Sequence, residues 1–203
     1  GLLAGAGMAA ALAAPAPAQE ASAADQLLAR EFGGMRVLLV RHAAAIAQVA
    51  CSSDEVRWLT TDGRATARRV GRALSELGLP ITCIYTSPLV RAVQTAEILA
   101  DTTGFTGPLE VHEPLALERG TTAQALSPLD HAGDDDLLVL VTHEPKIRVL
   151  AGHLSGLRGF PGFQTAGACL IEYERARQRG RFQWMLDPET LARATDVSSL
   201  GPH

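Results

Sequence analysis

The chain has 203 residues, enough for one domain with a sizeable hydrophobic core. Its formal net charge of -4 gives no electrostatic reason to expect binding to nucleic acid or to an anionic membrane. An anion site would therefore be local and built from a few placed arginines. The cysteines Cys51, Cys83 and Cys169 lie far apart without CxxC spacing, so they indicate neither a zinc site nor a disulfide framework.

The first 34 residues differ from the rest in composition, because alanine dominates residues 1–24. The triplet Ala16-Pro17-Ala18 has the pattern of a signal-peptide cleavage site, but the first basic residue is Arg30, so the positive n-region is missing. The segment is also too interrupted to span a membrane. We expect a low-complexity extension upstream of a natural start at Met35, with a short helix over 25–32, in a cytoplasmic protein. A signal-like segment of an exported protein is the alternative.

From Met35 onward, predicted strands and helices alternate. The apolar run over 36–40 predicts a strand buried on both faces, and a long loop over 43–59 follows it. Thr60 or Thr61 can cap a helix over 61–78. A strand over 82–86 then leads to Ser87-Pro88, which predicts a helix to about 101, with serine as the cap and proline at the first helical position.

The second half of the chain continues the pattern. It predicts a strand over 109–112, a helix over 121–129, an apolar strand over 137–141, a helix from Pro145 to Ser155, and a hairpin of strands over 168–173 and 182–186. This order predicts an α/β fold, a three-layer α/β/α sandwich with a mostly parallel central sheet. The predicted domain covers 35–193, and a flexible tail over 194–203 follows it.

Four polar side chains share one predicted edge of this sheet. Arg41 and His42 follow the first strand, Arg91 lies in the first turn of the helix after Ser87, and His143 follows the apolar strand over 137–141. Because the carboxyl ends of parallel strands meet at one edge, these side chains could converge. The planar guanidinium group of arginine can donate paired hydrogen bonds to phosphate oxygens, and the dipole at a helix amino terminus also favours an anion. The joint placement predicts a phosphate site.

Three segments resemble the histidine phosphatase superfamily, whose fold is phosphoglycerate mutase-like. They are Leu39-Val40-Arg41-His42-Ala43, the run from Ser87 to Ala96, and Val141-Thr142-His143-Glu144-Pro145. Within the superfamily, the chain is most similar to the small SixA-type phosphohistidine phosphatases, on the further segments 57–63, 163–166 and 182–188. The resemblance covers 35 to about 193 and leaves no room for the cap domain of larger members.

The resemblance implies a mechanism. His42 would be the nucleophile that takes the phosphoryl group onto a ring nitrogen before water releases it. Arg41, Arg91 and His143 would bind the phosphoryl oxygens and stabilise the transition state, with Ser87 as a further substrate-binding residue. No metal or other cofactor is expected, because fixed cations take its place.

The leaving group separates the candidate substrates. A phosphate ester expels an alkoxide, which needs a proton donor, whereas phosphohistidine expels an imidazole, which needs little help. Larger members of the superfamily carry an acidic residue after the third strand, but the segment over 113–120 resembles the SixA type more closely. Glu144 and Glu118 are the candidate donors. The sequence therefore favours a phosphoramidate substrate.

The leading hypothesis is a phosphatase that removes phosphate from a histidine on a partner signalling protein. The nearest alternative is a broad phosphomonoesterase of the same fold that acts on small phosphate esters with Glu144 or Glu118 as the acid. A catalytically inactive phosphate-binding module is the alternative from another class, and the intact set of four pocket residues argues against it. No pattern in the sequence indicates a role for Cys51, Asp54 or Glu55 in the loop over 43–59.

Overall fold

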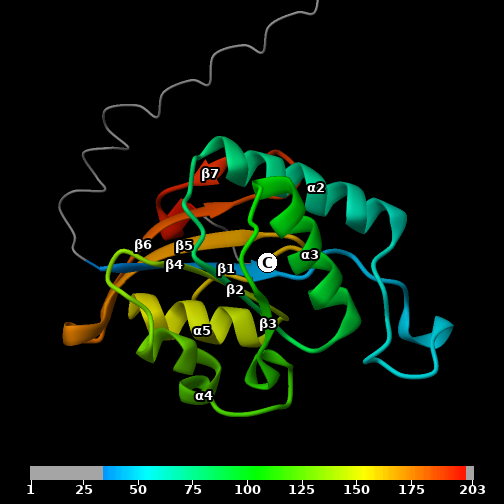
Figure 1. Cartoon of the computed structure of the whole chain (residues 1–203), viewed down its shortest axis with the longest axis horizontal. Helices are drawn as coiled ribbons and strands as arrows, with labels where there is room; N and C mark the ends of the chain where they lie inside the picture. The colour runs from blue at the N-terminus through cyan, green and yellow to red at the C-terminus, as the bar shows by residue number, and fades with distance from the viewer. Residues whose placement is uncertain (1–33, 200–203) are drawn as a thin grey trace, which may run out of the picture.

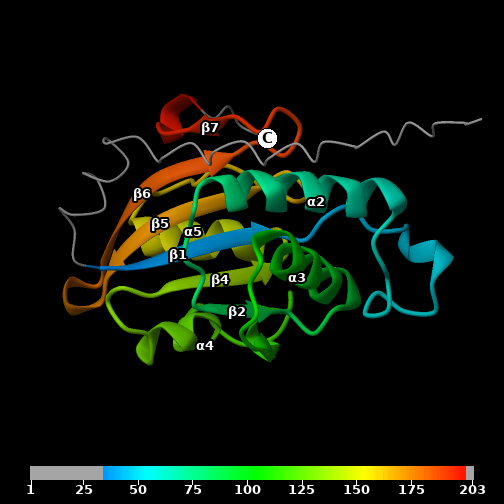
Figure 2. The ribbon, with the colours of Figure 1, turned by 45° about the horizontal axis from the view of Figure 1, so that its top comes forward.

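The computed structural model describes residues 34–199 of the chain. These residues form a seven-stranded mixed sheet with helices on both faces (Figures 1 and 2). The strand order is β3-β2-β4-β1-β5-β6-β7. The strands are β1 (Met35–Arg41), β2 (Cys83–Thr86), β3 (Leu109–Val111), β4 (Leu137–Thr142), β5 (Ala168–Glu174), β6 (Arg179–Leu186) and β7 (Arg193–Ala194). The α-helices are α2 (Thr61–Glu76), α3 (Val90–Thr103), α4 (Thr122–Leu126) and α5 (Lys146–Ser155).

The sheet divides into two halves at β1. The strands β3, β2, β4 and β1 run parallel, whereas β5 lies antiparallel to β1, and β6 and β7 continue as antiparallel neighbours. The three-layer α/β/α prediction is confirmed, and so is the parallel arrangement of the first four strands. The predicted hairpin is present as β5 and β6, and it makes the sheet mixed rather than purely parallel; the short strand β7, which was not predicted, extends the antiparallel half.

Each face of the sheet buries its own hydrophobic cluster. The helices α2 and α3 pack on one face with the β1 residues Leu38 and Val40. The helices α4 and α5 pack on the other face with Val37 and Leu39 (Figure 1). Because successive side chains of a strand point to opposite faces, a strand covered on both sides must be apolar at every position. This explains the unbroken apolar run that precedes Arg41.

The helix starts agree with the prediction in one case and differ in another. Thr60 caps α2, and its side chain accepts a hydrogen bond from the Gly63 amide at 3.0 Å. The prediction that Ser87 caps the next helix was wrong, since α3 begins at Val90 and its N-cap residue, Leu89, makes no side-chain cap bond. Ser87 lies before the helix, where its hydroxyl accepts from the Leu89 amide and also bonds to His143.

Other boundaries shift by a few residues. The helix predicted over 121–129 is α4 followed by a 3-10 turn over Ser127–Asp130, and β6 begins three residues earlier than expected. After β7 a 3-10 turn spans Val197–Ser199. The helix predicted over 25–32 lies outside the described residues, as do residues 1–33 and 200–203 of the predicted terminal segments. Within residues 34–199, no helix combines the length and apolar character needed to cross a bilayer.

Candidate active site

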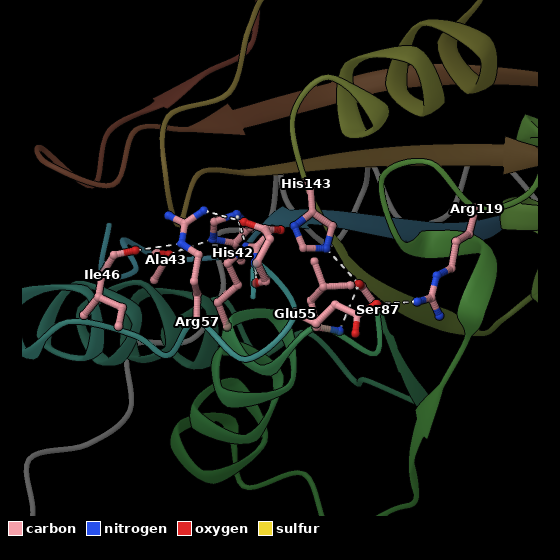
Figure 3. A network of polar contacts seen from close by, with 11 residues as sticks. His42, Ala43, Ile46, Glu55, Arg57, Ser87, Arg119 and His143 are labelled. Atoms are coloured by element: carbon pink, nitrogen blue, oxygen red, sulfur yellow. Dashed lines mark hydrogen bonds and ion pairs between the residues drawn. The ribbon is translucent and has the colours of Figure 1, made fainter. Parts of the chain in front are cut away.

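The carboxyl ends of three adjacent strands gather the predicted pocket residues. Arg41 ends β1 and His42 follows it, Ser87 follows β2, and His143 follows β4. The ring centroids of His42 and His143 lie 4.9 Å apart, and the Arg91 Nε is 3.2 Å from the His42 Nε2. Figure 3 shows His42 and His143 side by side at this edge, with Ser87 beneath His143. The structure thus brings all five side chains together.

The hydrogen bonds of His42 determine which ring nitrogen is free to react. Its Nδ1 lies 2.7 Å from the carbonyl oxygen of Ala43, which can only accept, so Nδ1 carries the hydrogen. The Nε2 therefore keeps its lone pair and accepts a hydrogen bond from Arg91 Nε. Thr95 supports this arrangement, since its hydroxyl accepts from the Ala43 amide at 3.1 Å and donates to the Arg91 carbonyl at 2.7 Å.

A similar argument assigns the hydrogen of His143, which is only 1% exposed. Its Nε2 lies 2.7 Å from the hydroxyl of Ser87, and that hydroxyl already accepts from the Leu89 amide at 3.3 Å. The hydroxyl hydrogen has no other acceptor among the described residues, so we assign it to Nε2, and this assignment places the hydrogen of the imidazole on Nδ1. This Nδ1 is buried and has no hydrogen-bond partner within residues 34–199. It is a donor directed at no protein acceptor.

The guanidinium groups supply the other donors. The Arg41 Nη1 donates to the carbonyl oxygen of Phe163, whereas its Nε is buried without a partner among the described residues. Arg91 is 2% exposed and directs its Nε at His42. Buried polar groups are normally hydrogen-bonded, so two unpaired donors beside one histidine indicate a site for an oxygen-rich ligand. A phosphoryl group has the oxygens and the charge to fill it.

The pocket keeps both histidines neutral. Burial and, to a smaller extent, the positive charges of Arg91, Arg41 and Arg57 together lower the pKa of His42 to about 4, against the opposing bond to Ala43. Burial, together with His42 and Arg91, lowers the pKa of His143 to about 3. At neutral pH, the His42 Nε2 therefore carries a lone pair and no proton, as nucleophilic attack requires.

This shift predicts an unusual pH profile. If His42 is the nucleophile, it must be deprotonated to attack, so the rate should be constant above about pH 5 and fall as the pH drops through about 4, not through the ordinary histidine value of 6.5. The measurement is kcat/KM against pH, corrected for ionisation of the substrate phosphate. A variant of the exposed His131, His131→Ala, should give the same profile. A fall in kcat/KM centred near pH 6.5 that is not explained by ionisation of the substrate would contradict the prediction.

The two candidate proton donors occupy different places. Glu144 borders the pocket, but its Oε1 accepts from the Phe163 amide at 2.7 Å and its Oε2 lies 3.9 Å from Arg148 Nε. Glu118 is exposed, and its carboxylate forms no hydrogen bond or ion pair within residues 34–199. The structure therefore brings Glu144 but not Glu118 to the phosphate site, and it places Glu144 in a hydrogen bond that holds the backbone around Phe163.

Several residues at the site were not identified from the sequence. Asp54, in the loop after β1, accepts hydrogen bonds from the pocket residue Arg91 and forms an ion pair with Arg57 at 2.7 Å. The Thr95 hydroxyl bonds the backbone of Ala43 and Arg91, and the Phe163 carbonyl accepts from the Arg41 guanidinium. Thr95 lies four residues after Arg91, on the same helix face, which is a signal that could have been used. A backbone carbonyl leaves no signal in the residue types.

The described residues do not form a cluster of typical metal ligands. Within residues 34–199, no three histidine, cysteine, aspartate or glutamate side chains lie close enough together to hold a metal ion. The cationic charge beside His42 comes from the guanidinium groups of Arg41 and Arg91. Together with neutral His42, these groups can bind a phosphoryl anion and accept it in covalent linkage.

Known proteins are similar to this chain in sequence and in fold. The family profile of the histidine phosphatase superfamily (branch 1) matches residues 37–120. An uncharacterised protein of Picosynechococcus is 39% identical over 115 residues, which are 56% of this chain and 68% of that protein. The phosphohistidine phosphatase SixA of Escherichia coli is 29% identical over 165 residues, which are 80% of this chain and all of SixA.

Solved structures agree with these relatives. The structure of the protein histidine phosphatase SixA complexed with tungstate superimposes with a TM-score of 0.71 at 25% identity, covering 78% of this chain and 100% of SixA. A phosphoglycerate mutase from Bacillus anthracis shares the fold with a TM-score of 0.58 at 13% identity, covering 82% of this chain and 95% of the mutase. The chain therefore belongs to the histidine phosphatase superfamily and is a SixA-like phosphatase with a phosphoglycerate mutase-like fold.

Proposed function

We propose that this protein removes the phosphoryl group from a phosphohistidine on a partner signalling protein, through a phosphohistidine intermediate on His42. In the first step, the lone pair of His42 Nε2 attacks phosphorus. The new P–N bond forms as the P–N bond to the substrate imidazole breaks, and the departing imidazole takes up a proton from water. Water then attacks the phosphoryl group on His42, which releases inorganic phosphate and restores the neutral imidazole.

The pocket donors stabilise the charge of both steps. The unpaired Arg41 Nε and His143 Nδ1 donate to phosphoryl oxygens, and the Arg91 Nε, which in this structure donates to His42 Nε2, donates instead to the same group when phosphate enters. These donors are already fixed by the fold, so they need little reorganisation as negative charge develops. A neutral nucleophile between fixed cations suits the transfer of an anionic group.

The hydrogen bonds and ion pairs of the carboxylates near the pocket are the observation that favours a phosphoramidate substrate. Glu144 accepts a backbone hydrogen bond, Asp54 bridges two arginines, and Glu113 pairs with Arg119. Expulsion of an alkoxide needs a protonated acid beside the leaving oxygen, and these carboxylates are held as acceptors. An imidazole leaving group does not need that acid. The name of the E. coli relative, phosphohistidine phosphatase SixA, points to the same substrate class.

The experiment compares two substrates under the same conditions. We expect kcat/KM for a phosphohistidine peptide to exceed that for p-nitrophenyl phosphate by about 100-fold or more, the size of a missing general-acid contribution. Glu144→Gln is the matched control, since the amide oxygen still accepts from Phe163 N but the side chain has no acidic proton. It should change neither rate by more than a few-fold.

A second function, a broad phosphomonoesterase for small phosphate esters, predicts the opposite results. It is favoured by the position of Glu144 at the pocket border, 2.7 Å from the Phe163 amide. It predicts a preference for the ester and a selective loss of ester hydrolysis in Glu144→Gln. An inactive phosphate-binding module would turn over neither substrate.

The proposed substrate also implies a location. A phosphohistidine signalling protein would meet this enzyme in the cytoplasm, where we place it. Export, the alternative raised by the composition of residues 1–34, would favour small esters instead. Mass spectrometry of the mature amino terminus in the native host separates these two cases, because a terminus just after Ala18 would indicate a processed signal segment, whereas a terminus at Met35 would indicate a natural start there.

A further inference from the structure

One carboxylate in the loop between β1 and α2 bridges two arginines at the pocket. The Asp54 Oδ2 accepts from Arg91 Nη2 at 2.8 Å, and its Oδ1 accepts from Arg57 Nη1 at 2.7 Å. The backbone carbonyl of Asp54 also accepts from Arg91 Nη1 at 2.7 Å. Asp54 thus holds the far end of the guanidinium whose Nε points at His42. None of the phosphate-binding motifs of the sequence includes this residue.

The hydrogen count of Arg91 shows which of its donors Asp54 uses. A guanidinium has five N–H groups in one plane. Asp54 takes one from each terminal nitrogen, and His42 Nε2 takes the one on Nε. Each terminal nitrogen therefore keeps one N–H. The contacts with Asp54 fix the plane of the guanidinium and leave the two remaining terminal hydrogens available to a phosphoryl group; the Nε hydrogen becomes available when it leaves His42 Nε2.

The loop itself is tied to the rest of the site. The Val90 amide, at the start of α3, donates to the Glu55 carbonyl at 3.1 Å, and the Glu55 carboxylate pairs with Arg119 at 2.7 Å (Figure 3). Arg57 donates its Nε to the Ile46 carbonyl at 2.7 Å, which closes the loop on itself. Asp54 is therefore presented to Arg91 by an anchored loop.

From these contacts we infer that Asp54 is a positioning residue for phosphoryl transfer, which holds the Arg91 guanidinium with its Nε directed at His42 and holds Arg57 at the pocket rim. The inference rests on the proposed function, in which Arg91 stabilises the transferred group. A residue that orients a catalytic donor affects the rate more than the binding of substrate, because small errors of placement weaken the transition state most.

The charge of Asp54 suits this role. Burial raises its pKa, but the hydrogen bonds from Arg57 and Arg91 lower the pKa more, so that it lies below the usual aspartate value. Asp54 therefore stays ionised across the pH range in which His42 is neutral. An ionised carboxylate is a strong acceptor for two guanidinium groups and cannot serve as the acid for a leaving group.

A different reading of the same contacts is that Asp54 competes with phosphate for Arg91. The donors left open argue against it, since the Arg41 Nε and the His143 Nδ1 remain unpaired while Asp54 is in place. The two readings predict opposite effects of removing the carboxylate. A positioning residue is needed for turnover, whereas a competing anion slows it.

The test uses the full chain with Asp54→Ala and Asp54→Asn. We expect Asp54→Ala to lower kcat for the phosphohistidine peptide by about 10- to 100-fold with KM changed by less than about threefold. Asp54→Asn keeps one side-chain oxygen as an acceptor and should lose less. Glu55→Gln is the matched control, because it breaks only the exposed ion pair with Arg119 and keeps the Glu55 carbonyl bond to Val90 and the Arg57 bond to Ile46, which hold the loop. It should keep kcat within about twofold.

A double-mutant cycle with Arg91 tests the positioning role of Asp54 separately from the proposed function. If Asp54 acts through Arg91, then Asp54→Ala should cost nothing further in an Arg91→Ala background, or in Arg91→Lys if the alanine variant does not fold. Full additivity, or an increase in kcat/KM in Asp54→Ala alone, would overturn the positioning role. An unaffected Asp54→Ala beside an impaired Arg91→Ala would overturn it and leave the proposed function standing. An unimpaired Arg91→Ala would overturn both.

Discussion

Replacement of His42 by alanine should lower hydrolysis of the phosphohistidine peptide about 10³-fold or more, because the nucleophile that receives the phosphoryl group is lost. The wild-type enzyme should also form a phosphoenzyme that is labile in acid and stable in base, as expected for a P–N bond. Rapid quenching with ³²P-labelled substrate measures it. In His42→Ala, no label should remain on the protein.

The matched control is His153→Ala, at an exposed histidine on α5. It should hydrolyse substrate and trap phosphate as the wild type does. Label that persists in His42→Ala would show another nucleophile, and His143, whose ring centroid is 4.9 Å from that of His42, would be the first to examine. Full activity in His42→Ala would reject covalent catalysis by this residue.

Replacement of Arg91 by alanine should lower kcat by about 10²- to 10³-fold, or about 2.7–4 kcal/mol of transition-state stabilisation. Arg91 supplies the donor nearest to His42, and burial strengthens its interaction with the transferred group. Arg91→Lys keeps the charge but not the planar fork, so we expect an intermediate loss. Affinity for inorganic vanadate should fall in the same order.

Because Arg91 is buried among hydrogen bonds, its variants require a stability measurement beside the kinetics. Thermal unfolding should show a lower midpoint, since Asp54 and His42 lose a partner. Arg68→Ala, at an exposed arginine on α2, controls for loss of an arginine from the surface and should change neither rate nor midpoint appreciably. A folded Arg91→Ala enzyme with wild-type kcat would exclude Arg91 from the transition state.

The strand ends were predictable because of how parallel sheets are built. An apolar run that stops at Arg41 marks both a buried strand and the edge at which it ends, and the run before His143 does the same. Since β1 and β4 are neighbours in the sheet, the side chains after them had to lie close together. The convergence of Arg41, His42 and His143 followed from pattern and topology alone.

The hydrogen bonds of Ser87 could not be predicted from the sequence pattern. Its type and its neighbour Pro88 are typical of a helix start, but tertiary contact overrides that preference, because the hydroxyl is bonded to a histidine 56 positions further along the chain. The places of the two candidate proton donors also depend on the tertiary structure. Glu144 and Glu118 are equivalent as residue types, and only the fold places one against the Phe163 amide and the other in solvent.

The amino-acid sequence alone was sufficient for the family, the three-layer architecture and the edge of the sheet that holds the pocket, because hydrophobic periodicity and contiguous motifs carry that information. The folded chain was needed to show that a loop without a recognisable motif reaches Arg91 through Asp54, 37 positions away. Contacts between distant segments depend on how the loop closes over the sheet edge, and no local preference of its residues encodes that closure.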